Sequence, residues 1–159
     1  MPKAKKQEKG EKAEKETKGT KISKEMKEIM KRKEGVEGKK GEEKEKEECV
    51  FCKIARKEVP AEIVYESMNF IAFPDVRPRT EGHTIIIPKK HYVNLMDMPI
   101  SLGGELLEAV KKIFETRAKE GAEGFNLVVN NFPAAGQFVM HAHVHLLPRK
   151  GQDGKELGL

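Results

Sequence analysis

Three histidines stand at alternate positions near the C-terminal end of the chain, at His141, His143 and His145. Successive side chains of a β-strand point to opposite faces, so a strand over residues 139–147 would place the three imidazoles on one face. The neighbouring apolar residues would form the opposite face: Met140, Ala142, Val144 and Leu146. Because three adjacent imidazolium ions would repel one another, we expect at least one histidine to be neutral. A neutral imidazole can attack phosphorus or bind a metal ion.

Two other interpretations of the alternating histidines are open at this point. They could form a metal-binding patch on a sheet, or they could be polar residues that happen to share a solvated face. A histidine tag would be contiguous and terminal, whereas this run alternates and is flanked by branched apolar residues. It also follows the glycine-containing segment 135–137. These features favour a core strand whose histidines do chemistry.

The composition of the chain changes near Glu48. Residues 1–48 contain no aromatic residue, and they hold 17 Lys or Arg against 13 Asp or Glu, whereas residues 49–159 hold 14 against 13. A segment so poor in apolar residues cannot offset the entropy lost on folding, so we expect a charged, largely disordered N-terminal extension. Its basic character would allow contact with nucleic acid. The interleaved glutamates and the lack of aromatic side chains for base stacking favour a solvated extension instead.

Residues 49–159 have the length of one compact domain. No apolar run is long enough to predict a membrane span, and no apolar segment near the N-terminus predicts a signal peptide. Two cysteines are too few for the disulfide scaffold of a small secreted protein. We therefore expect a soluble, cytoplasmic protein.

The hydrophobic pattern of residues 49–159 predicts an α+β fold. Apolar residues recur every three to four positions over 102–119, which predicts one long amphipathic helix, and residues 50–57 have the pattern of a short helix. Branched and aromatic residues predict strands over 63–66, 69–73, 83–88, 125–130 and 139–147. The short connections between most strands favour antiparallel pairing. We expect an antiparallel sheet of about five strands with one long helix and a short N-terminal helix.

The alternating histidines and their surroundings resemble the histidine triad (HIT) family. The signature of that family is His-x-His-x-His followed by two apolar residues, and residues 141–147 match it. Further matching stretches are Phe51 to Ile54, Ala72-Phe73 with Asp75 and Pro78, Gly82-His83 with residues 87–91, and Asn130 with Gly136-Gln137. The resemblance covers nearly all of residues 49–150. It implies a HIT-like fold and a homodimer whose sheets join.

The resemblance also implies an activity, namely cleavage of a phosphoramidate or phosphoanhydride at the α-phosphate of an adenosine-like purine nucleotide. His143 would attack phosphorus and form a covalent nucleotidyl-histidine, His145 would bind a phosphoryl oxygen or the leaving group, and His83 would hydrogen-bond behind them. The nucleophile needs one unprotonated ring nitrogen and a hydrogen bond that holds the other. The remaining nucleotide-binding residues implied are Asn130, Gly136 and Gln137 for the phosphoryl oxygens, Asp75 for the ribose, and Phe51, Ile54, Val59, Phe73 and Val76 for the base. The apolar members of this set have the residue types of an ordinary core as well.

Cys49 and Cys52 form a Cys-x-x-Cys pair, which by itself is compatible with redox chemistry or with two inert thiols. By resemblance to zinc-containing HIT proteins, His91 and His141 would complete a Cys₂His₂ set. Such a set would hold a structural zinc ion with all four coordination positions filled, tying the N-terminal segment to the histidine strand. No organic cofactor is expected.

Phe138 departs from the family pattern, because many HIT proteins have Ser or Thr there, a hydroxyl thought to assist the leaving group of phosphoramidates. A phenyl ring cannot donate that hydrogen bond. Residues 133–137 and 147–150 resemble the dinucleoside polyphosphate hydrolases of the family, whereas residues 49–65 resemble its phosphoramidases. The leaving group therefore stays open. Two alternative functions also stay open: a nucleotide-binding module with little turnover, and a hydrolase whose three triad histidines bind a catalytic zinc ion.

Overall fold

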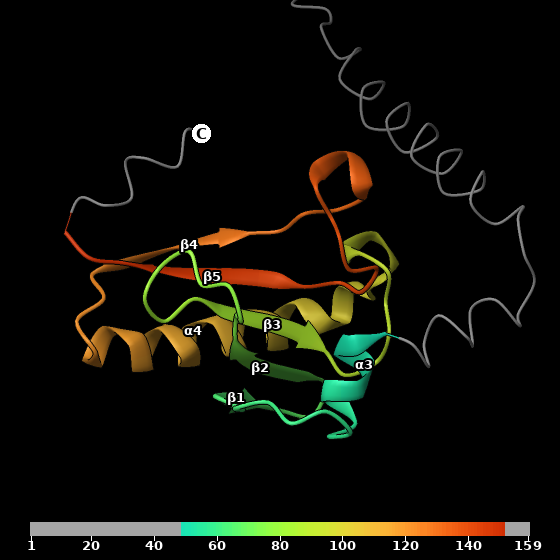
Figure 1. The fold of residues 1–159 in the computed structure, drawn as a ribbon, viewed down its shortest axis with the longest axis horizontal. Coiled ribbons are helices and arrows are strands. Elements are labelled where there is room, and N and C mark those ends of the chain that lie inside the picture. Colours follow the sequence, from blue (N-terminus) through green and yellow to red (C-terminus); the bar gives the residue numbers. More distant parts are fainter. Residues whose placement is uncertain (1–48, 152–159) are drawn as a thin grey trace, which may run out of the picture. The chain divides into compact units, whose positions relative to one another are not determined.

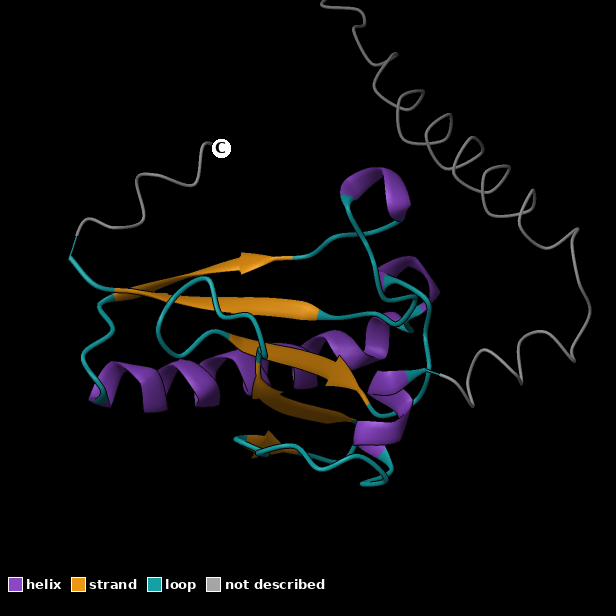
Figure 2. Ribbon diagram, in the orientation of Figure 1, coloured by secondary structure: helices purple, strands orange, loops and turns teal. Residues whose placement is uncertain are grey.

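The computed structural model describes residues 49–151, and the predictions for residues 1–48 lie outside the described residues. The described part is an antiparallel sheet of five strands with a long helix on one face and a short helix on the other (Figure 1, Figure 2). In chain order the elements are α3 (Val50–Ala55), β1 (Tyr65–Glu66), β2 (Phe70–Pro74), β3 (Thr84–Pro88), α4 (Gly103–Lys119), β4 (Gly124–Val128) and β5 (Val144–Arg149). The α+β class and the antiparallel sheet are as predicted.

The strands are arranged in the order β1-β2-β3-β5-β4, and every neighbouring pair is antiparallel. The pairing places one row of residues across the four strands β2, β3, β5 and β4: Phe73 faces Ile85, Ile85 faces His145, and His145 faces Val128. Directly opposed residues in antiparallel strands point to the same face of a sheet. Side chains from four separate chain segments therefore meet in one row.

Two apolar clusters cover the two faces of the sheet. The residues of α4 pack on one face, where Val110 and Ile113 contact a cluster that includes Phe70 and Leu146. The residues of α3 pack on the other face, against side chains of β2 and β3 that include Ile71 and Ile87. The central strands β2 and β3 are buried on both faces, which explains why their sequences are continuously apolar and do not alternate.

The strand predicted over residues 139–147 begins only at Val144, so that prediction was wrong for His141 and His143. Strand β3 pairs with residues 144–146, and β4 ends at Val128 opposite His145. Residues 139–143 therefore have no strand beside them, and the Ala142 N–H donates to the carbonyl of Tyr92 instead, at 2.6 Å.

The apolar face predicted for this segment is confirmed in part. Val144 and Leu146 are buried on the side of α4. Ala142 is also buried, whereas Met140 is 37% exposed. The three buried residues lie in β5 or next to it, whereas Met140 lies in the segment 139–143, which pairs with no strand.

The predicted helices are confirmed, with different ends. α4 covers most of the predicted range and follows a 3₁₀ turn at Ile100–Leu102, although one of its apolar residues, Leu107, is 53% exposed. α3 ends two residues earlier than predicted because Lys57 has a φ of 63°, a left-handed conformation that stops a helix.

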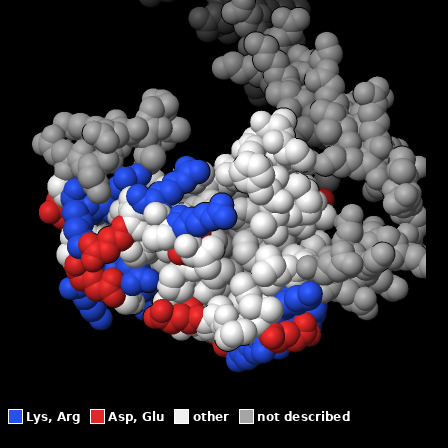
Figure 3. All heavy atoms as spheres, viewed as in Figure 1, with Lys and Arg blue, Asp and Glu red and all other residues white. Residues whose placement is uncertain are grey.

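Figure 3 shows side chains of both charge signs around a broad uncharged area, in keeping with the nearly balanced charge of residues 49–159. Within residues 49–151, no helix is long and apolar enough to cross a membrane.

Candidate functional site

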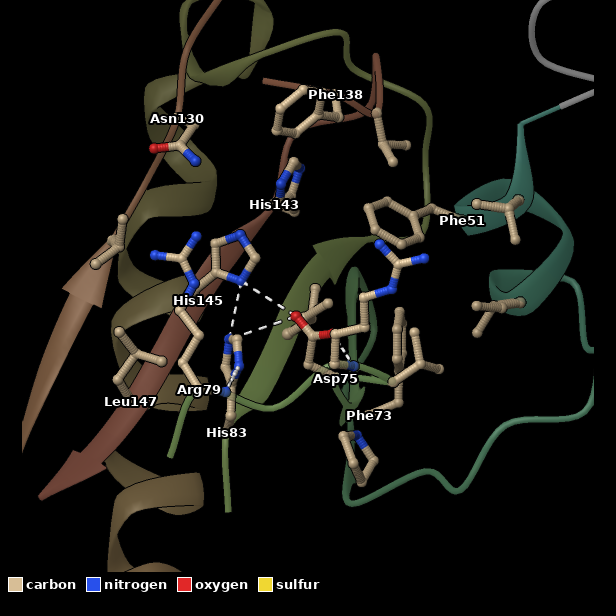
Figure 4. Close-up of a pocket in the computed structure, with 18 of the residues that line it drawn as sticks. Phe51, Phe73, Asp75, Arg79, His83, Asn130, Phe138, His143, His145 and Leu147 are labelled. Atoms are coloured by element: carbon tan, nitrogen blue, oxygen red, sulfur yellow. Dashed lines mark hydrogen bonds and ion pairs between the residues drawn. The ribbon is translucent and has the colours of Figure 1, made fainter. Parts of the chain in front are cut away.

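A cavity of about 510 Å³ opens over the row Phe73, Ile85, His145 and Val128, on the face of the sheet that α3 covers. Its walls come from α3, from the loop between β2 and β3, and from the segment between β4 and β5. Figure 4 shows that His143 and His145 point into this space from one side, with Phe51 and Phe73 on the opposite side. The cavity therefore combines two imidazoles with an apolar wall.

His143 is held in the tautomer that a nucleophile requires. Its Nδ1 lies 2.7 Å from the backbone carbonyl oxygen of His141. A carbonyl can only accept, so Nδ1 carries a proton, and in the neutral ring it is Nε2 that has the lone pair. The ring is 93% buried and packs edge-on against Phe51, at 5.4 Å between ring centroids. The contacts of His143 thus fix the orientation of its ring and place a proton on Nδ1.

A chain of hydrogen bonds fixes the tautomers of His83 and His145. The backbone N–H of Arg79 donates to Nδ1 of His83 at 3.2 Å, so the proton of a neutral His83 lies on Nε2. That N–H faces Nδ1 of His145 at 3.0 Å. Nδ1 of His145 is then the acceptor, and its Nε2 carries a proton. Nε2 of the neutral His145 ring is therefore a hydrogen-bond donor, and this ring lies next to that of His143.

The protein environment keeps this pair of histidines uncharged. Burial lowers the pKa of His145 to about 4, with further lowering by the charges of His143 and His83, while Asp75 opposes the shift. Burial also lowers the pKa of His83, again with Asp75 opposing. Near neutral pH both rings are unprotonated bases, which agrees with the tautomers that the hydrogen bonds define.

Asp75 lines the cavity, and its Oδ1 accepts from the backbone N–H of Arg77 at 2.8 Å. Its Oδ2 is 3.6 Å from Nε2 of His83 and 3.7 Å from Nδ1 of His145, so these three residues have the spacing of a metal site. Nε2 of neutral His83 is protonated, however, and has no lone pair for a metal ion. We therefore interpret the cluster as a hydrogen-bonded group.

A second cluster contains the predicted metal ligands Cys49, Cys52, His91 and His141. Nδ1 of His141 is 3.5 Å from both sulfur atoms, and Nδ1 of His91 is 3.1 Å from the sulfur of Cys52. In a tetrahedral site with ordinary zinc–sulfur and zinc–nitrogen bonds, sulfur and nitrogen ligands are about 3.6 Å apart. The four donor atoms therefore fit around one small metal ion.

The protonation states of this cluster also suit a metal ion. Nε2 of His141 donates to the carbonyl of Pro88 at 2.9 Å, which leaves Nδ1 as the ring nitrogen that faces the sulfur atoms. Burial raises the pKa of the Cys49 thiol, but hydrogen bonds with His141, His91 and the backbone of Cys52 outweigh burial and lower it to about 5. A thiolate is the metal-binding form of cysteine. A metal ion at this cluster would replace the protons that the histidine nitrogens and the sulfur atoms share.

The three triad histidines do not share one metal ion in the described part of the chain. His141 directs Nδ1 at the cysteines, whereas His143 directs its protonated Nδ1 at a carbonyl and His145 accepts a hydrogen bond on Nδ1. The alternative of a catalytic zinc bound by all three histidines therefore has no geometric support.

Most of the predicted nucleotide-binding residues line the cavity: Phe51, Ile54, Phe73, Asp75, Val76, Asn130 and Gly136. Val76 lies at the mouth and is 94% exposed. The structure places Val59 outside the cavity, against the cluster on the α3 face of the sheet. Val59 therefore packs against the apolar core, which is the alternative to a base-binding role that its residue type also allowed.

Gln137 is also outside the cavity lining, and its side chain is 97% buried. Its Oε1 accepts from the backbone N–H of Phe132 at 2.8 Å, and its Nε2 donates to the carbonyls of Val93 and Val139. Phe132 has a φ of 72°, an uncommon conformation for a residue with a side chain. Gln137 thus stabilises the loop that carries Gly136 and does not itself reach into the cavity.

Two arginines that the sequence reasoning did not single out, Arg77 and Arg79, also line the cavity. They flank Pro78 in the loop that follows Asp75. Two cationic residues so close to a carboxylate expected to bind ribose could have indicated from the sequence that both arginines belong to the site. Phe138, noted for its departure from the family, is 95% exposed at the rim.

Comparison with known proteins gives consistent results. A family model described as HIT domain matches residues 56–152. An uncharacterized HIT-like protein of Methanocaldococcus jannaschii is 45% identical over 107 residues, which cover 67% of this chain and 83% of that protein.

Two relatives have names that state an activity. An adenylylsulfatase of Arabidopsis thaliana is 42% identical over 66% of this chain and 54% of its own length. An adenosine 5'-monophosphoramidase of Candida albicans is 37% identical over 65% of this chain and 72% of its own length. Among solved structures, a zinc-bound histidine triad family protein of Mycobacterium smegmatis superposes with a TM-score of 0.64 and 37% identity, over 68% of this chain and 79% of that one.

Proposed function

This chain belongs to the HIT family, and from that premise we propose that it is a nucleotide hydrolase or transferase acting at the α-phosphate of an adenosine nucleotide. The observation that carries the proposal is the orientation of His143, whose protonated Nδ1 is held by the carbonyl of His141 in a ring that lines the cavity, so that in the neutral ring Nε2 has the lone pair. An unprotonated imidazole nitrogen on a fixed ring is the nucleophile that phosphoryl chemistry needs.

In the proposed reaction Nε2 of His143 forms a bond to phosphorus, and the bond from phosphorus to the leaving group breaks. The positive charge that develops on the ring is stabilised at Nδ1 by the carbonyl of His141. The Nε2 proton of His145 faces the cavity and donates to a phosphoryl oxygen or to the departing atom. Water then cleaves the nucleotidyl-histidine and regenerates the free imidazole.

The cavity suits an adenosine nucleotide in size and in polarity. Its volume of about 510 Å³ lies within the usual range of small-molecule sites, and Phe51, Ile54 and Phe73 give it one apolar wall for a base. Asp75 has a second carboxylate oxygen beyond the one that accepts from Arg77, and we assign it to the ribose hydroxyls. Asn130 and the backbone at Gly136 are the proposed donors to the phosphoryl oxygens.

We further propose that Cys49, Cys52, His91 and His141 hold a structural zinc ion. The donor spacing, the thiolate character of Cys49 and the tautomer of His141 support this assignment, as does the zinc-bound relative of similar fold. Zinc with four protein ligands has no open position for substrate, and its contribution is to hold the start of α3 against the segment that carries the triad.

A homodimer is also part of the proposal. Strand β4 is an edge of the sheet, and Phe125 and Leu127 on it are 39% and 46% exposed. An exposed apolar edge strand is a template for pairing with a second copy. Sedimentation analysis should give a dimer, and Leu127→Lys should shift the protein toward the monomer; a monomeric wild-type protein would exclude this arrangement.

The test of the proposed activity is the covalent intermediate. Rapid quenching in an alkaline denaturant, which preserves a phosphorus–histidine bond, after mixing with adenosine phosphoramidate or a diadenosine polyphosphate should let peptide mass spectrometry find adenylate on His143. The matched variant His143→Ala should lose both the adduct and turnover while still binding adenosine monophosphate. Hydrolysis that persists in His143→Ala, or turnover without any adduct, would refute the mechanism. Nucleotide binding with neither adduct nor turnover would identify a binding module.

A further inference from the structure

The two sides of the cavity differ in charge. Figure 4 shows Phe51 and Phe73 on one side of the His143–His145 pair, and Arg79 and Asn130 on the other. If the apolar side takes the base and His143 attacks phosphorus, the leaving group must depart toward the opposite side. The environment of that opposite side therefore determines which leaving groups the protein accepts.

Arg79 is fixed in this position by its own backbone. Its N–H donates to Nδ1 of His83, which in turn faces His145, so the start of the Arg79 side chain is tied to the catalytic group. From there the side chain extends beside His145 toward Asn130 (Figure 4). Its positive charge contributes to the low pKa of both His83 and His145.

The guanidinium of Arg79 has no carboxylate partner among residues 49–151, in contrast to Arg56 and Arg117, which each pair with a glutamate. The neighbouring carboxylate of Asp75 accepts from the backbone of Arg77 and faces the two histidines. An unpaired guanidinium at the wall of a cavity is a ready binding site for phosphate or sulfate oxygens, which match its fork of donors.

We propose that Arg79 binds the leaving group and selects nucleotides whose leaving group is an anion of the phosphate type over those that release an amine. This inference rests on the proposed function and specifies its substrate class. When the P–O bond of such a substrate breaks, the electron pair stays on the bridging oxygen and the group leaves as an anion. It needs positive charge and hydrogen-bond donors, which Arg79 and the N–H of His145 supply, and no added proton.

An amine leaving group has the opposite requirement. When a P–N bond breaks, the nitrogen must gain a proton. His145 is a weak source of that proton because it is neutral at ordinary pH, its pKa being lowered to about 4. Phe138 at the rim has no hydroxyl to assist. Both features of the cavity favour departure as an anion.

The experiment compares substrates that share the adenylate group and differ only in what leaves. We measure kcat/KM for a diadenosine polyphosphate and for adenosine phosphoramidate in the wild-type protein and in Arg79→Gln, Arg79→Lys and Arg77→Gln. Arg79→Gln should lower the ratio of the two values by about 10- to 100-fold, the usual effect of one charged hydrogen bond, and Arg79→Lys should restore part of it. Arg77→Gln controls for the net charge of the loop and should change the ratio by less than about threefold, since it removes charge without that hydrogen bond.

An equal loss for both substrates in Arg79→Gln would overturn the proposal, because it would mean that the charge of Arg79 acts only on the shared adenylate group or through His83 and His145. An unchanged ratio, or an equal change in Arg77→Gln, would overturn it as well. Nucleotide affinity measured in the His143→Ala variant tests the role of Arg79 separately from the proposed covalent mechanism, because a binding measurement needs no turnover. There, adenosine diphosphate should bind more tightly than the monophosphate, and Arg79→Gln should remove the difference; equal affinities with Arg79 present would reject the subsite.

Discussion

Removal of one proposed metal ligand should separate the role of the cysteine and histidine cluster from that of the proposed nucleophile, His143. Cys52 is buried, and its sulfur lies 3.1 Å from Nδ1 of His91 and 3.5 Å from that of His141. Cys52→Ala removes one of the two thiolates and leaves three of the four proposed ligands. Structural zinc contributes about 10–16 kcal/mol of apparent binding free energy, which is as large as the whole stability of an ordinary domain. We therefore expect this variant to lose the ion and the fixed position of α3.

The consequence for nucleotide binding follows from what α3 carries. Phe51 and Ile54 project from this helix into the cavity. Full burial of one large apolar side chain contributes about 1.5–3 kcal/mol. Loss of one such contact with the base should raise the dissociation constant for adenosine monophosphate by about 10- to 150-fold.

Metal content by mass spectrometry and nucleotide affinity by calorimetry are the two measurements. His143→Ala should keep one equivalent of zinc, and Lys53→Ala, in the same helix but outside the cluster, should keep both the metal and the affinity. If Cys52→Ala does not fold, zinc removal from the wild-type protein by a chelator gives the same comparison. A full equivalent of zinc in Cys52→Ala, or its loss from His143→Ala, would show that the ligand set is wrong.

Three further outcomes follow from the cavity. Phe138→Ser should raise kcat/KM for adenosine phosphoramidate several-fold by supplying a hydroxyl to the departing nitrogen, with little change in Tm because Phe138 is 95% exposed; an unchanged rate would argue against that role. Asp75→Asn should raise KM for the ribonucleotide about tenfold while leaving KM for a 2',3'-dideoxy analogue nearly unchanged, and equal effects on both would separate Asp75 from the ribose. The neutral state of His145 should make the protein less stable as pH falls from 6.5 toward 4, because only the unfolded chain gains the proton there. His145→Gln should remove up to about 3 kcal/mol of this loss, measured by denaturant unfolding at pH 7 and pH 4.5, and an identical pH dependence in the variant would contradict the assignment.

The elements of this fold were predictable where a hydrophobic period extended over many residues. The long helix α4 has such a pattern, the buried strands β2 and β3 are instead short unbroken apolar runs, and all three appear close to their predicted positions. The start of β5 was not predictable in the same way. Residues 139–143 have an extended, alternating pattern like a strand, but whether they pair depends on where β4 ends in space, and a one-dimensional pattern does not contain that information.

The chemistry of the site divides in a similar manner. The residue types of the triad and of the metal cluster were visible in the sequence. The tautomers were not, because they depend on backbone groups that the fold brings close: the carbonyl of Pro88 for His141 and the N–H of Arg79 for His83. Gln137 was assigned to substrate, yet its amide serves the backbone around Phe132, whose unusual φ no sequence pattern revealed.

The spacing of the first two histidines has a specific structural reason that goes beyond the alternation of a strand. His141 acts through two different groups: its ring directs Nδ1 at the cysteines, while its backbone carbonyl accepts the Nδ1 proton of His143. A side chain can reach the carbonyl two residues earlier when the backbone between them is extended, so the intervening Ala142 must not belong to a helix or a tight turn. Any movement of the His141 ring out of the metal cluster would also move the carbonyl that fixes the nucleophile. Loss of the metal should therefore lower kcat as well as affinity, whereas a change confined to the base wall, such as Ile54→Ala, should affect affinity alone.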